Sequence, residues 1–453
     1  MSQIVALNRR IFLKGAGMTA LAGALGTGGN LAAPQAAAAT RSAFDFDEVY
    51  NRVGTDCSKW DYQMERFEPH EIVVAMGVAD MDFRTAPAIT SALRKRLEHE
   101  NWGYLHLPES FKQSIADWNR RRYGEEIDPD LILNATGVIP AIDNAIRAFA
   151  PPGSKVILQS PVYSSFYSSI KRVGCVVDEN PLKPVDGRYQ MDFEDLERRI
   201  DHDTHVLILC NPHNPTGNCW SPDDLKRLGE ICTRRRVVVF ADEIHCDFVN
   251  KGHRYTPYTS IDDEDIVRNS VSFKSTSKSF NTAALKAAYM YSGNADYIER
   301  IKATGHSEYI NTLGAVGCQA AYDEGEEWLN ELITYIDGNM DRVAEFVDAE
   351  MEHVSIVKPQ GTYLAWLDFS EFGEKIGAAE LAAEYNARRD PEKPELAPTH
   401  MIQQYLVEKA GVYLNDGHRY GHGGDGNMRM NLATCRQLVD VALERIADVT
   451  KKV

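Results

Sequence analysis

Short apolar runs that alternate with helical segments are the strongest constraint on the fold of this chain. Continuous runs of this length are typical of strands buried on both faces of a sheet. Helices that alternate with such strands indicate a mostly parallel sheet covered on both sides. We therefore predict an α/β fold. The runs cover residues 131–133, 155–159, 205–210, 237–241 and 267–273.

Polar or turn-forming residues follow each run. The carboxyl ends of parallel strands meet at one edge of a sheet, and ligands bind in the crevice outside that edge. We therefore predict a single site there, built from five loops. The residues that follow the five runs, in order, are Gly137, Tyr163, Asn214, Asp242 and Lys278.

Lys278 lies in a hydroxyl-rich turn and is the first candidate for chemistry. Phe280 and the largely apolar stretch 283–291 follow it, which favours a position near the interior. Burial shifts a lysine toward the neutral amine, which is its nucleophilic form. Such a lysine commonly forms a Schiff base or carries a proton. A solvated loop lysine is the alternative at this point.

A phosphate group has several candidate donors at the same edge. Gly137 and Val138 open a helix directly after a strand, and the free N–H groups of a helix start bind phosphate well. Ser275, Ser277 and Lys286 are further donors from the lysine turn. A plain strand–helix turn is the alternative for Gly137.

Four other side chains have both a functional and a structural interpretation. Asp242 follows an apolar strand and needs a cationic partner, or it caps a helix. Tyr163 stacks on a flat ligand or packs in the core. Asn214, between two prolines, donates to a ring oxygen or forms a turn. Arg429, on a predicted strand, clamps a carboxylate or faces solvent.

One cofactor fits these groups together. Pyridoxal phosphate needs an amine for its aldehyde, a phosphate cradle, a carboxylate at its ring nitrogen and an aromatic ring against its face. Lys278, the Gly137 helix start, Asp242 and Tyr163 are the respective candidates.

A second, smaller α/β region is expected after the first sheet. Its predicted strands cover residues 354–357, 361–369, 411–414 and 428–433, and a helix over 436–449 ends the chain. With 453 residues, two domains are the default. We predict an arm over 40–85 that joins the small domain, a large cofactor domain over 86–325 and a small domain over 326–453.

The first 39 residues have the three parts of an export signal. Arg9 and Arg10 precede Phe12-Leu13-Lys14, a mild apolar run follows, and Ala37-Ala38-Ala39 supplies a cleavage site. The paired arginines resemble a twin-arginine signal, which predicts export to the periplasm by the twin-arginine machinery.

The composition of the chain indicates which binding partners and which cysteine chemistry to expect. The formal charge of −17 disfavours nucleic acid and anionic membrane surfaces, and no later apolar run is long enough for stable membrane insertion. The eight cysteines lie mostly in or beside apolar runs, and no C-x-x-C spacing points to a zinc site. We expect no disulfides and no metal.

Several motifs resemble the class I/II aminotransferases, which are pyridoxal phosphate enzymes of fold type I. They are Asn214-Pro215-Thr216-Gly217, the Asp242 strand end, the turn 275–278 and Arg429-x-Asn431. Finer features are similar to the cystathionine β-lyase-like carbon–sulfur lyases. These are Lys59-Trp60-Asp61, Ala79-Asp80-Met81-Asp82-Phe83, Asp242-Glu243-Ile244-His245, Ser277-Lys278-Ser279-Phe280-Asn281 and Gly361-Thr362-Tyr363-Leu364-x-Trp366. The resemblance covers residues 45–450.

The resemblance implies a role for each site residue. Lys278 binds pyridoxal 5′-phosphate covalently and later moves the Cα proton. Asp242 pairs with the ring nitrogen, Asn214 and His245 lie near the ring hydroxyl, and Tyr163 stacks on the ring. The implied phosphate-binding residues are Gly137, Val138, Ser275 and Ser277, with Tyr104 from a neighbouring subunit. That last contact implies a homodimer, and Arg429 binds the carboxylate of an amino-acid substrate.

Three departures from the resemblance concern the substrate. Ala283-Ala284 replaces the Ala-Gly pair that often follows the Phe-Asn pair in these families. Lys286 stands where the wider class has a phosphate-binding arginine, and the segment 372–398 is longer than usual for the carbon–sulfur lyases.

The expected reaction is elimination from cystathionine or S-substituted cysteines, giving thiol, pyruvate and ammonia. The alternatives are an aminotransferase with a 2-oxo acid acceptor, a racemase, and a regulatory protein without catalysis.

Overall fold

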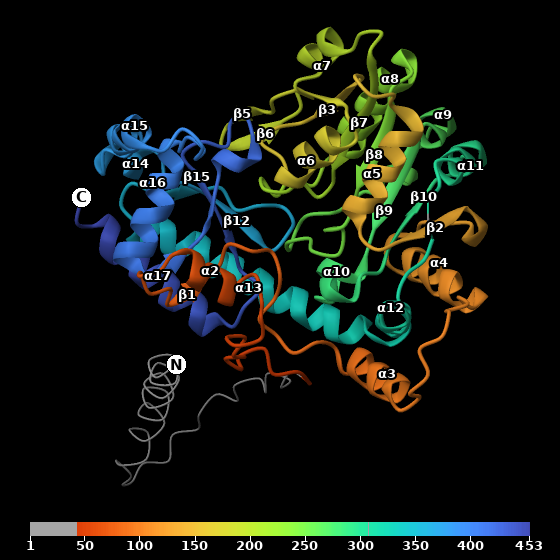
Figure 1. Cartoon of the computed structure of the whole chain (residues 1–453), viewed down its shortest axis with the longest axis horizontal. Helices are drawn as coiled ribbons and strands as arrows, with labels where there is room; N and C mark the ends of the chain where they lie inside the picture. The colour runs from red at the N-terminus through yellow and green to blue at the C-terminus, as the bar shows by residue number, and fades with distance from the viewer. Residues whose placement is uncertain (1–42, 307) are drawn as a thin grey trace, which may run out of the picture.

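A seven-stranded sheet forms the centre of the computed structural model, which describes residues 43–306 and 308–453 (Figure 1). β10 is antiparallel to both of its neighbours, and all other neighbouring pairs are parallel. The predicted mostly parallel sheet is therefore confirmed. Its strands, in spatial order, are β2 (Ile132–Ala135), β10 (Ala288–Tyr291), β9 (Ser270–Lys274), β8 (Val238–Asp242), β7 (Thr204–Cys210), β3 (Lys155–Leu158) and β4 (Val176–Glu179).

Both faces of this sheet are covered by helices because successive side chains of a strand point to opposite faces. In β7, Val206 and Ile208 pack against α5 (Val138–Phe149), α6 (Ser164–Arg172) and α11 (Ala295–Ala303). Leu207 and Leu209 pack on the other side against α7 (Phe193–Arg199), α8 (Pro222–Arg235) and α9 (Glu264–Arg268). The central strands β7 and β8 are largely apolar for this reason.

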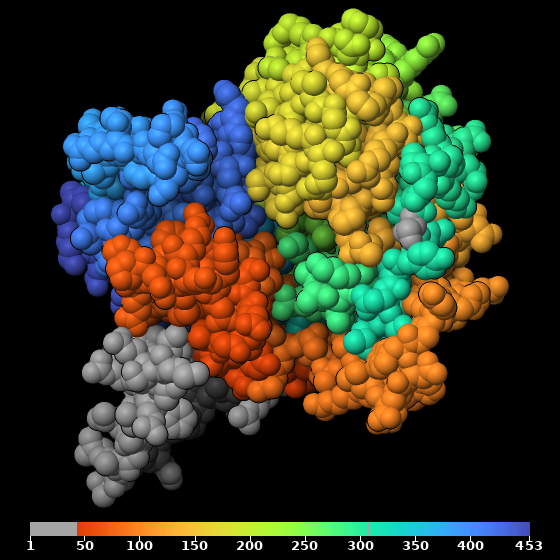
Figure 2. All heavy atoms as spheres, in the orientation of Figure 1, coloured from red at the N-terminus to blue at the C-terminus, as the bar shows by residue number. Residues whose placement is uncertain are grey.

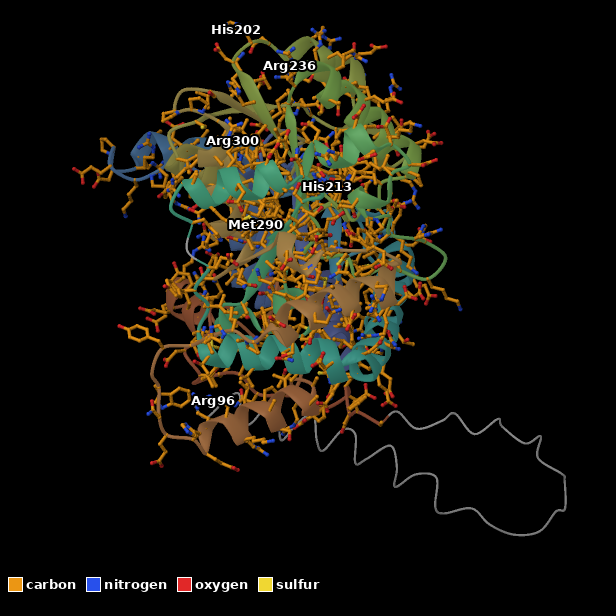
Figure 3. The ribbon with its side chains drawn as sticks, turned by 90° about the vertical axis from the view of Figure 1, so that its right-hand side faces the viewer. Arg96, His202, His213, Arg236, Met290 and Arg300 are labelled. Carbon is orange, nitrogen blue, oxygen red and sulfur yellow. The ribbon has the colours of Figure 1, made fainter. Side chains whose placement is uncertain are left out.

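Further helices lie beside the β2–β10 end of the sheet. They are α3 (Pro87–Leu97), α4 (Glu109–Tyr123), α12 (Thr312–Glu324) and the first half of α13 (Glu326–Glu350). Trp328 and Leu332 of α13 belong to this core, whereas Met340 and Val347 belong to the next one. Helix α13 therefore connects the two cores. In Figure 3, Arg96 of α3 and His202 lie at opposite ends of the molecule, with Met290 of β10 between them.

The second core surrounds a four-stranded antiparallel sheet in the C-terminal region, where we expected a smaller α/β region. Its order is β11 (Ser355–Ile356), β12 (Leu364–Asp368), β15 (Asn427–Asn431) and β14 (Asn415–Asp416). The N-terminal arm contributes β1 (Val74–Ala75), which pairs in parallel with β13 (Val412–Tyr413). The helices here are α2 (Asp61–Arg66), α14 (Ser370–Lys375), α15 (Ala378–Arg388), α16 (Pro398–Tyr405), the π-helix η4 (Leu406–Ala410) and α17 (Arg436–Thr450). The domain boundaries given above stay a prediction.

The smaller elements complete the chain. β5 (Lys183–Val185) and β6 (Arg188–Gln190) form a hairpin that is separate from the large sheet. The short helix α10 (Thr276–Ser279) directly follows β9. Single 3-10 turns are η1 (Pro129–Leu131), η2 (Tyr258–Ser260), η3 (Ala283–Leu285) and η5 (His418–Tyr420).

Two local predictions were wrong. The fifth strand begins at Ser270 and not at Val267, because Asp263 accepts hydrogen bonds from the N–H groups of Asp265 and Ile266 and so starts α9. The hydroxyl-rich turn around Lys278 is helical, because the Ser275 hydroxyl accepts the N–H of Ser277 and caps α10. In each place a polar side chain that caps a short helix decided the local structure.

All eight cysteines are free in this structure, and all except Cys219 are buried. Within the described ranges, no helix is both long and apolar enough to cross a membrane. The predicted export signal over residues 1–39 lies outside the described residues.

Candidate active site

Lys278 lies on α10, between the C-terminal core and the large sheet (Figure 1). Its Nζ donates a hydrogen bond to the carbonyl oxygen of Ala79 at 2.7 Å. Burial lowers the pKa of Lys278 to about 8, and the positive charge of Arg429 adds to the effect. Near neutral pH a useful fraction of the amine is therefore uncharged. The solvated-loop alternative for this lysine is wrong.

Asp242 is the last residue of β8 and is 3% exposed. Its Oδ1 accepts one hydrogen bond, from the N–H of Ile244 at 3.1 Å. A turn follows it and not a helix, so the helix-cap alternative does not apply. Burial raises the pKa of Asp242 to about 7. In the part of the chain that the structure describes, no lysine or arginine forms an ion pair with it, so a cationic ligand would stabilise it.

Arg429 and Asn214 join the two sheets at this place. Arg429 of β15 is 3% exposed, and its Nη1 donates to Asn214 Oδ1 at 3.0 Å. Its Nη2 donates to the carbonyl oxygen of Gly77 at 2.9 Å, while its Nε is buried without a partner. The solvent-facing alternative for Arg429 is therefore wrong. A buried guanidinium with donor capacity to spare is suited to bind a carboxylate.

His245 is a buried polar side chain with free hydrogen-bonding capacity. It is 2% exposed, and neither ring nitrogen has a hydrogen-bond partner among residues 43–306 and 308–453. Its ring meets that of Tyr363 edge to face, with the centroids 5.6 Å apart. Burial lowers the pKa of His245 well below its usual value, and the charges of Lys278 and Arg429 add to this. The neutral ring offers one donor and one acceptor to a ligand.

The predicted phosphate donors follow β2 and β9, two strands that are separated by β10. Gly137 precedes the first turn of α5, and Val138 begins that helix. Ser275 and Ser277 place their hydroxyl oxygens 2.6 Å apart. Lys286 is exposed and has a left-handed backbone, with φ of 57°. β2 and β9 both flank β10, so these donors belong to the same edge of the sheet.

The two predicted tyrosines differ in their surroundings. Tyr163 is partly buried, immediately before α6, and its ring packs edge to face on Phe166 at 5.6 Å. Tyr104 is fully exposed, with a relative accessibility of 107%, in the segment between α3 and α4. Tyr104 is therefore the predicted site residue whose role depends on a second subunit.

The structure adds site residues to which the sequence gave no role. The Tyr363 hydroxyl donates to the Ala79 carbonyl oxygen at 3.0 Å, the oxygen that also accepts from Lys278. The Arg429 guanidinium lies 5.2 Å from the ring centre of Tyr420. Ala79 and Tyr363 are part of motifs that resemble the carbon–sulfur lyases, so these motifs could have pointed to the two residues.

Tyr420 lies in no recognised motif, and the one sequence feature beside it is a glycine-rich segment. Gly421, Gly423 and Gly426 have the spacing G-x-G-x-x-G, but β15 follows them and not a helix. A dinucleotide fingerprint needs a helix at that position, so this spacing is not one.

Comparison with known proteins agrees with this geometry. The family model for aminotransferase class I and II matches residues 71–446. Cystathionine β-lyase PatB of Bacillus subtilis is 38% identical over 89% of this chain and 98% of its own length. Protein MalY of Escherichia coli is 30% identical over 90% of this chain and 100% of its own.

A solved structure extends the comparison. Cystalysin from Treponema denticola, whose crystal structure contains a pyridoxal 5′-phosphate cofactor, matches with a TM-score of 0.81 at 30% identity. The match covers 90% of this chain and 99% of cystalysin. Figure 2 shows the face of the molecule on which the N-terminal arm lies beside the C-terminal core and the large domain.

The raised pKa of Asp242 predicts a stability effect with a definite sign. The folded state binds this proton more tightly than the unfolded chain, so stability falls as pH rises from about 4 to about 7. Asp242→Asn removes the cost, and we expect the cofactor-stripped variant to be more stable at pH 8, by at most about 4 kcal/mol. At pH 4 the two proteins should be equally stable in urea unfolding.

Asp82→Asn is the contrasting control for this prediction. Asp82 pairs with the buried Lys59 at 2.7 Å, so its loss should destabilise the protein at pH 8. Equal or lower stability of Asp242→Asn at pH 8 would contradict the assignment of an unpaired, desolvated carboxylate.

Proposed function

Because the chain belongs to the class I and II aminotransferase family and is a pyridoxal 5′-phosphate-dependent enzyme similar to cystathionine β-lyase, we propose that it is a carbon–sulfur β-lyase. The proposed substrates are cystathionine or S-substituted cysteines, and the products are a thiol, pyruvate and ammonia. The observation that carries the proposal is the cluster of the partly buried Lys278 with the buried Asp242, His245 and Arg429, in which an amine with a lowered pKa lies among side chains with unused bonding capacity.

The residues present fit the cofactor. Asp242 would hold the ring nitrogen, since this carboxylate has one backbone donor and no cation. His245, with two unpartnered nitrogens, and Asn214 would bind the ring hydroxyl. Tyr163 would lie against the ring. The phosphate would bind to the start of α5 at Gly137 and Val138 and to the hydroxyls of Ser275 and Ser277.

The cofactor supplies, when bound, an electron sink that makes the proton on the substrate Cα acidic. Arg429 is proposed to bind the substrate carboxylate and so fix the direction of the Cα–H bond. Lys278 would take that proton, because its lowered pKa of about 8 leaves on the order of a tenth of the amine neutral at pH 7. Loss of the sulfur substituent from Cβ then completes the elimination, and water releases pyruvate and ammonia.

An aminotransferase is the second candidate, and the match to the class I and II family model favours it. It would use the same residues and differ in the atom to which Lys278 returns the proton. Elimination needs no second substrate, whereas transamination needs a 2-oxo acid.

The acceptor requirement separates the two reactions. With cystathionine or S-methylcysteine alone, we expect many turnovers of pyruvate per protein chain, measured by a coupled dehydrogenase assay. Lys278→Ala should lose the absorbance band of the lysine-bound cofactor and about 10²–10⁴-fold in rate. If pyruvate forms only once per chain, or only after a 2-oxo acid is added, the lyase proposal is wrong.

We further propose that the protein is a homodimer. Trp102, Tyr104, Leu105, Tyr309 and Leu313 line an open cavity of about 760 Å³, and several of these rings are exposed. An exposed apolar surface of this kind is typical of a protein interface. A second copy would cover it and bring Tyr104 to the phosphate of the partner.

The dimer proposal predicts a cofactor effect from a distant residue. Tyr104→Phe should leave the sedimentation coefficient of the dimer unchanged and weaken pyridoxal phosphate binding about tenfold, the loss of one hydrogen bond to a charged group. Tyr62→Phe, at another exposed tyrosine, is the matched control. A monomer in sedimentation, or wild-type affinity of Tyr104→Phe, would refute the shared site.

The proposed localisation is periplasmic, by twin-arginine export. Arg9→Lys with Arg10→Lys should retain the protein in the cytoplasmic fraction of the producing cell, measured by fractionation and immunoblotting. Unchanged periplasmic recovery of this variant would contradict the export route.

A further inference from the structure

Asp247 links the two segments that carry the candidate site. It is 6% exposed and lies five residues beyond Asp242 in the turn after β8. Its Oδ2 accepts a hydrogen bond from the hydroxyl of Ser279, the residue that follows Lys278 in α10. Its Oδ1 accepts from Arg122 Nε at 2.7 Å and from the Tyr123 hydroxyl at 2.5 Å. One carboxylate therefore holds the Asp242 turn, α10 and α4 together.

Helix α10 depends on such contacts for its position. It spans four residues, Thr276–Ser279, and a helix this short is not stable by itself. Thr276 bonds to the Thr282 hydroxyl at 2.8 Å, and Ser277 bonds to Ser275. Over residues 43–306 and 308–453, Asp247 is the one acidic side chain that is hydrogen-bonded to a side chain of α10. Hydrogen bonds to an ionised group are about twice as strong as neutral ones.

Arg122 holds Asp247 in place and extends the link to α13. Its Nη1 donates to Asn330 Oδ1 at 2.8 Å and to Glu326 Oε1 at 3.3 Å, both on that helix. The pKa of Arg122 is raised by Asp247 against the opposing effect of burial, so the guanidinium stays charged. Because α13 contributes to both cores, the contact chain runs from Lys278 to the helix that connects them.

Tyr123 donates to Asp247 and does not compete with it for protons. Burial and the neighbouring carboxylate raise the pKa of Tyr123 well above its usual value, so the hydroxyl stays protonated. The Tyr123 ring also lies against the buried Lys274, 4.7 Å from its Nζ. Asp247 therefore receives three donors, two from α4 and one from α10, and its carboxylate cannot rotate without breaking at least one of these hydrogen bonds.

We propose that Asp247, held by Arg122, is a positioning residue for Lys278. It fixes α10 through Ser279, so that the lysine amine keeps its place relative to Asp242 and His245. The inference rests on the proposed role of Lys278 as the cofactor-binding lysine. A misplacement of about 1 Å in an active site can cost on the order of a hundredfold in rate, which gives this link a functional consequence.

The adjacent arginine provides a matched control. Arg121 is on the same helix and bonds to Glu326 and to the Tyr322 carbonyl oxygen, but it makes no hydrogen bond to Asp247. Ser279→Thr keeps the hydroxyl that Ser279→Ala removes. Comparison of Arg122→Gln with Arg121→Gln, and of Ser279→Ala with Ser279→Thr, separates the proposed link from a general loss of stability.

Two measurements on the full-length holoenzyme test the link without any substrate. The first is hydrogen exchange of the backbone amides in the peptide that covers residues 276–281. The second is the rate at which hydroxylamine displaces Lys278 from the cofactor, followed by absorbance. We expect Asp247→Asn, Arg122→Gln and Ser279→Ala to raise both rates about tenfold, the loss of one charge-assisted hydrogen bond. Arg121→Gln and Ser279→Thr should match the wild type.

The outcomes are decisive in either direction. If Ser279→Ala and Arg122→Gln behave like their controls in both measurements, Asp247 does not position Lys278. If Asp247→Asn does not fold, the Ser279 pair carries the same test, because it leaves every charge in place. An enzyme that proves to be an aminotransferase would still show these effects, so failure of the lyase proposal is distinguishable from failure of this one.

Discussion

The site depends on a segment of the N-terminal arm, residues 77–82, whose backbone carbonyls bind the catalytic candidates. Gly77 accepts from Arg429, and Ala79 accepts from both Lys278 and Tyr363. The carbonyl oxygens of Val78 and Asp80 accept from Asn431. These carbonyls face both sheets, so the arm sets the distance between the large sheet and Arg429. Gly77 is required here because a Cβ would lie 2.3 Å from the Tyr413 ring.

Buried ionisable side chains fall into two groups, those with a partner of opposite charge and those without one. The supporting charges are paired: Lys59 with Asp82 at 2.7 Å and Lys274 with Glu125 at 2.6 Å. The candidate catalytic groups are not, so burial raises the pKa of Asp242 and lowers those of Lys278 and His245. Buried groups whose charge is uncompensated are candidates for ligand binding, because a ligand can supply the missing partner. The paired charges stabilise the structure around the candidate site.

Most of the fold and much of the site could be predicted from local patterns. The five apolar runs became β2, β3, β7, β8 and β9, because strands buried on both faces leave a continuous apolar signal. Asp242 and Lys278 were found because polar residues at those strand ends stand out. The start of β9 was misplaced, since the cap at Asp263 is a local hydrogen-bond choice that apolar periodicity does not report. Asp247 had no signal, because its partners come from α4 and α10.

Two lysines show which property of the site the sequence alone does not determine. Lys274 and Lys278 are four residues apart in one hydroxyl-rich stretch, and the sequence alone determined that a parallel strand ends there and that an amine lies at its edge. Only the tertiary structure decided how the two amines differ in charge. Glu125 and Glu243 raise the pKa of Lys274, whereas burial and the charge of Arg429 lower that of Lys278 to about 8. The difference arises from groups far away in the chain, since a buried amine takes its charge state from whatever the fold places around it.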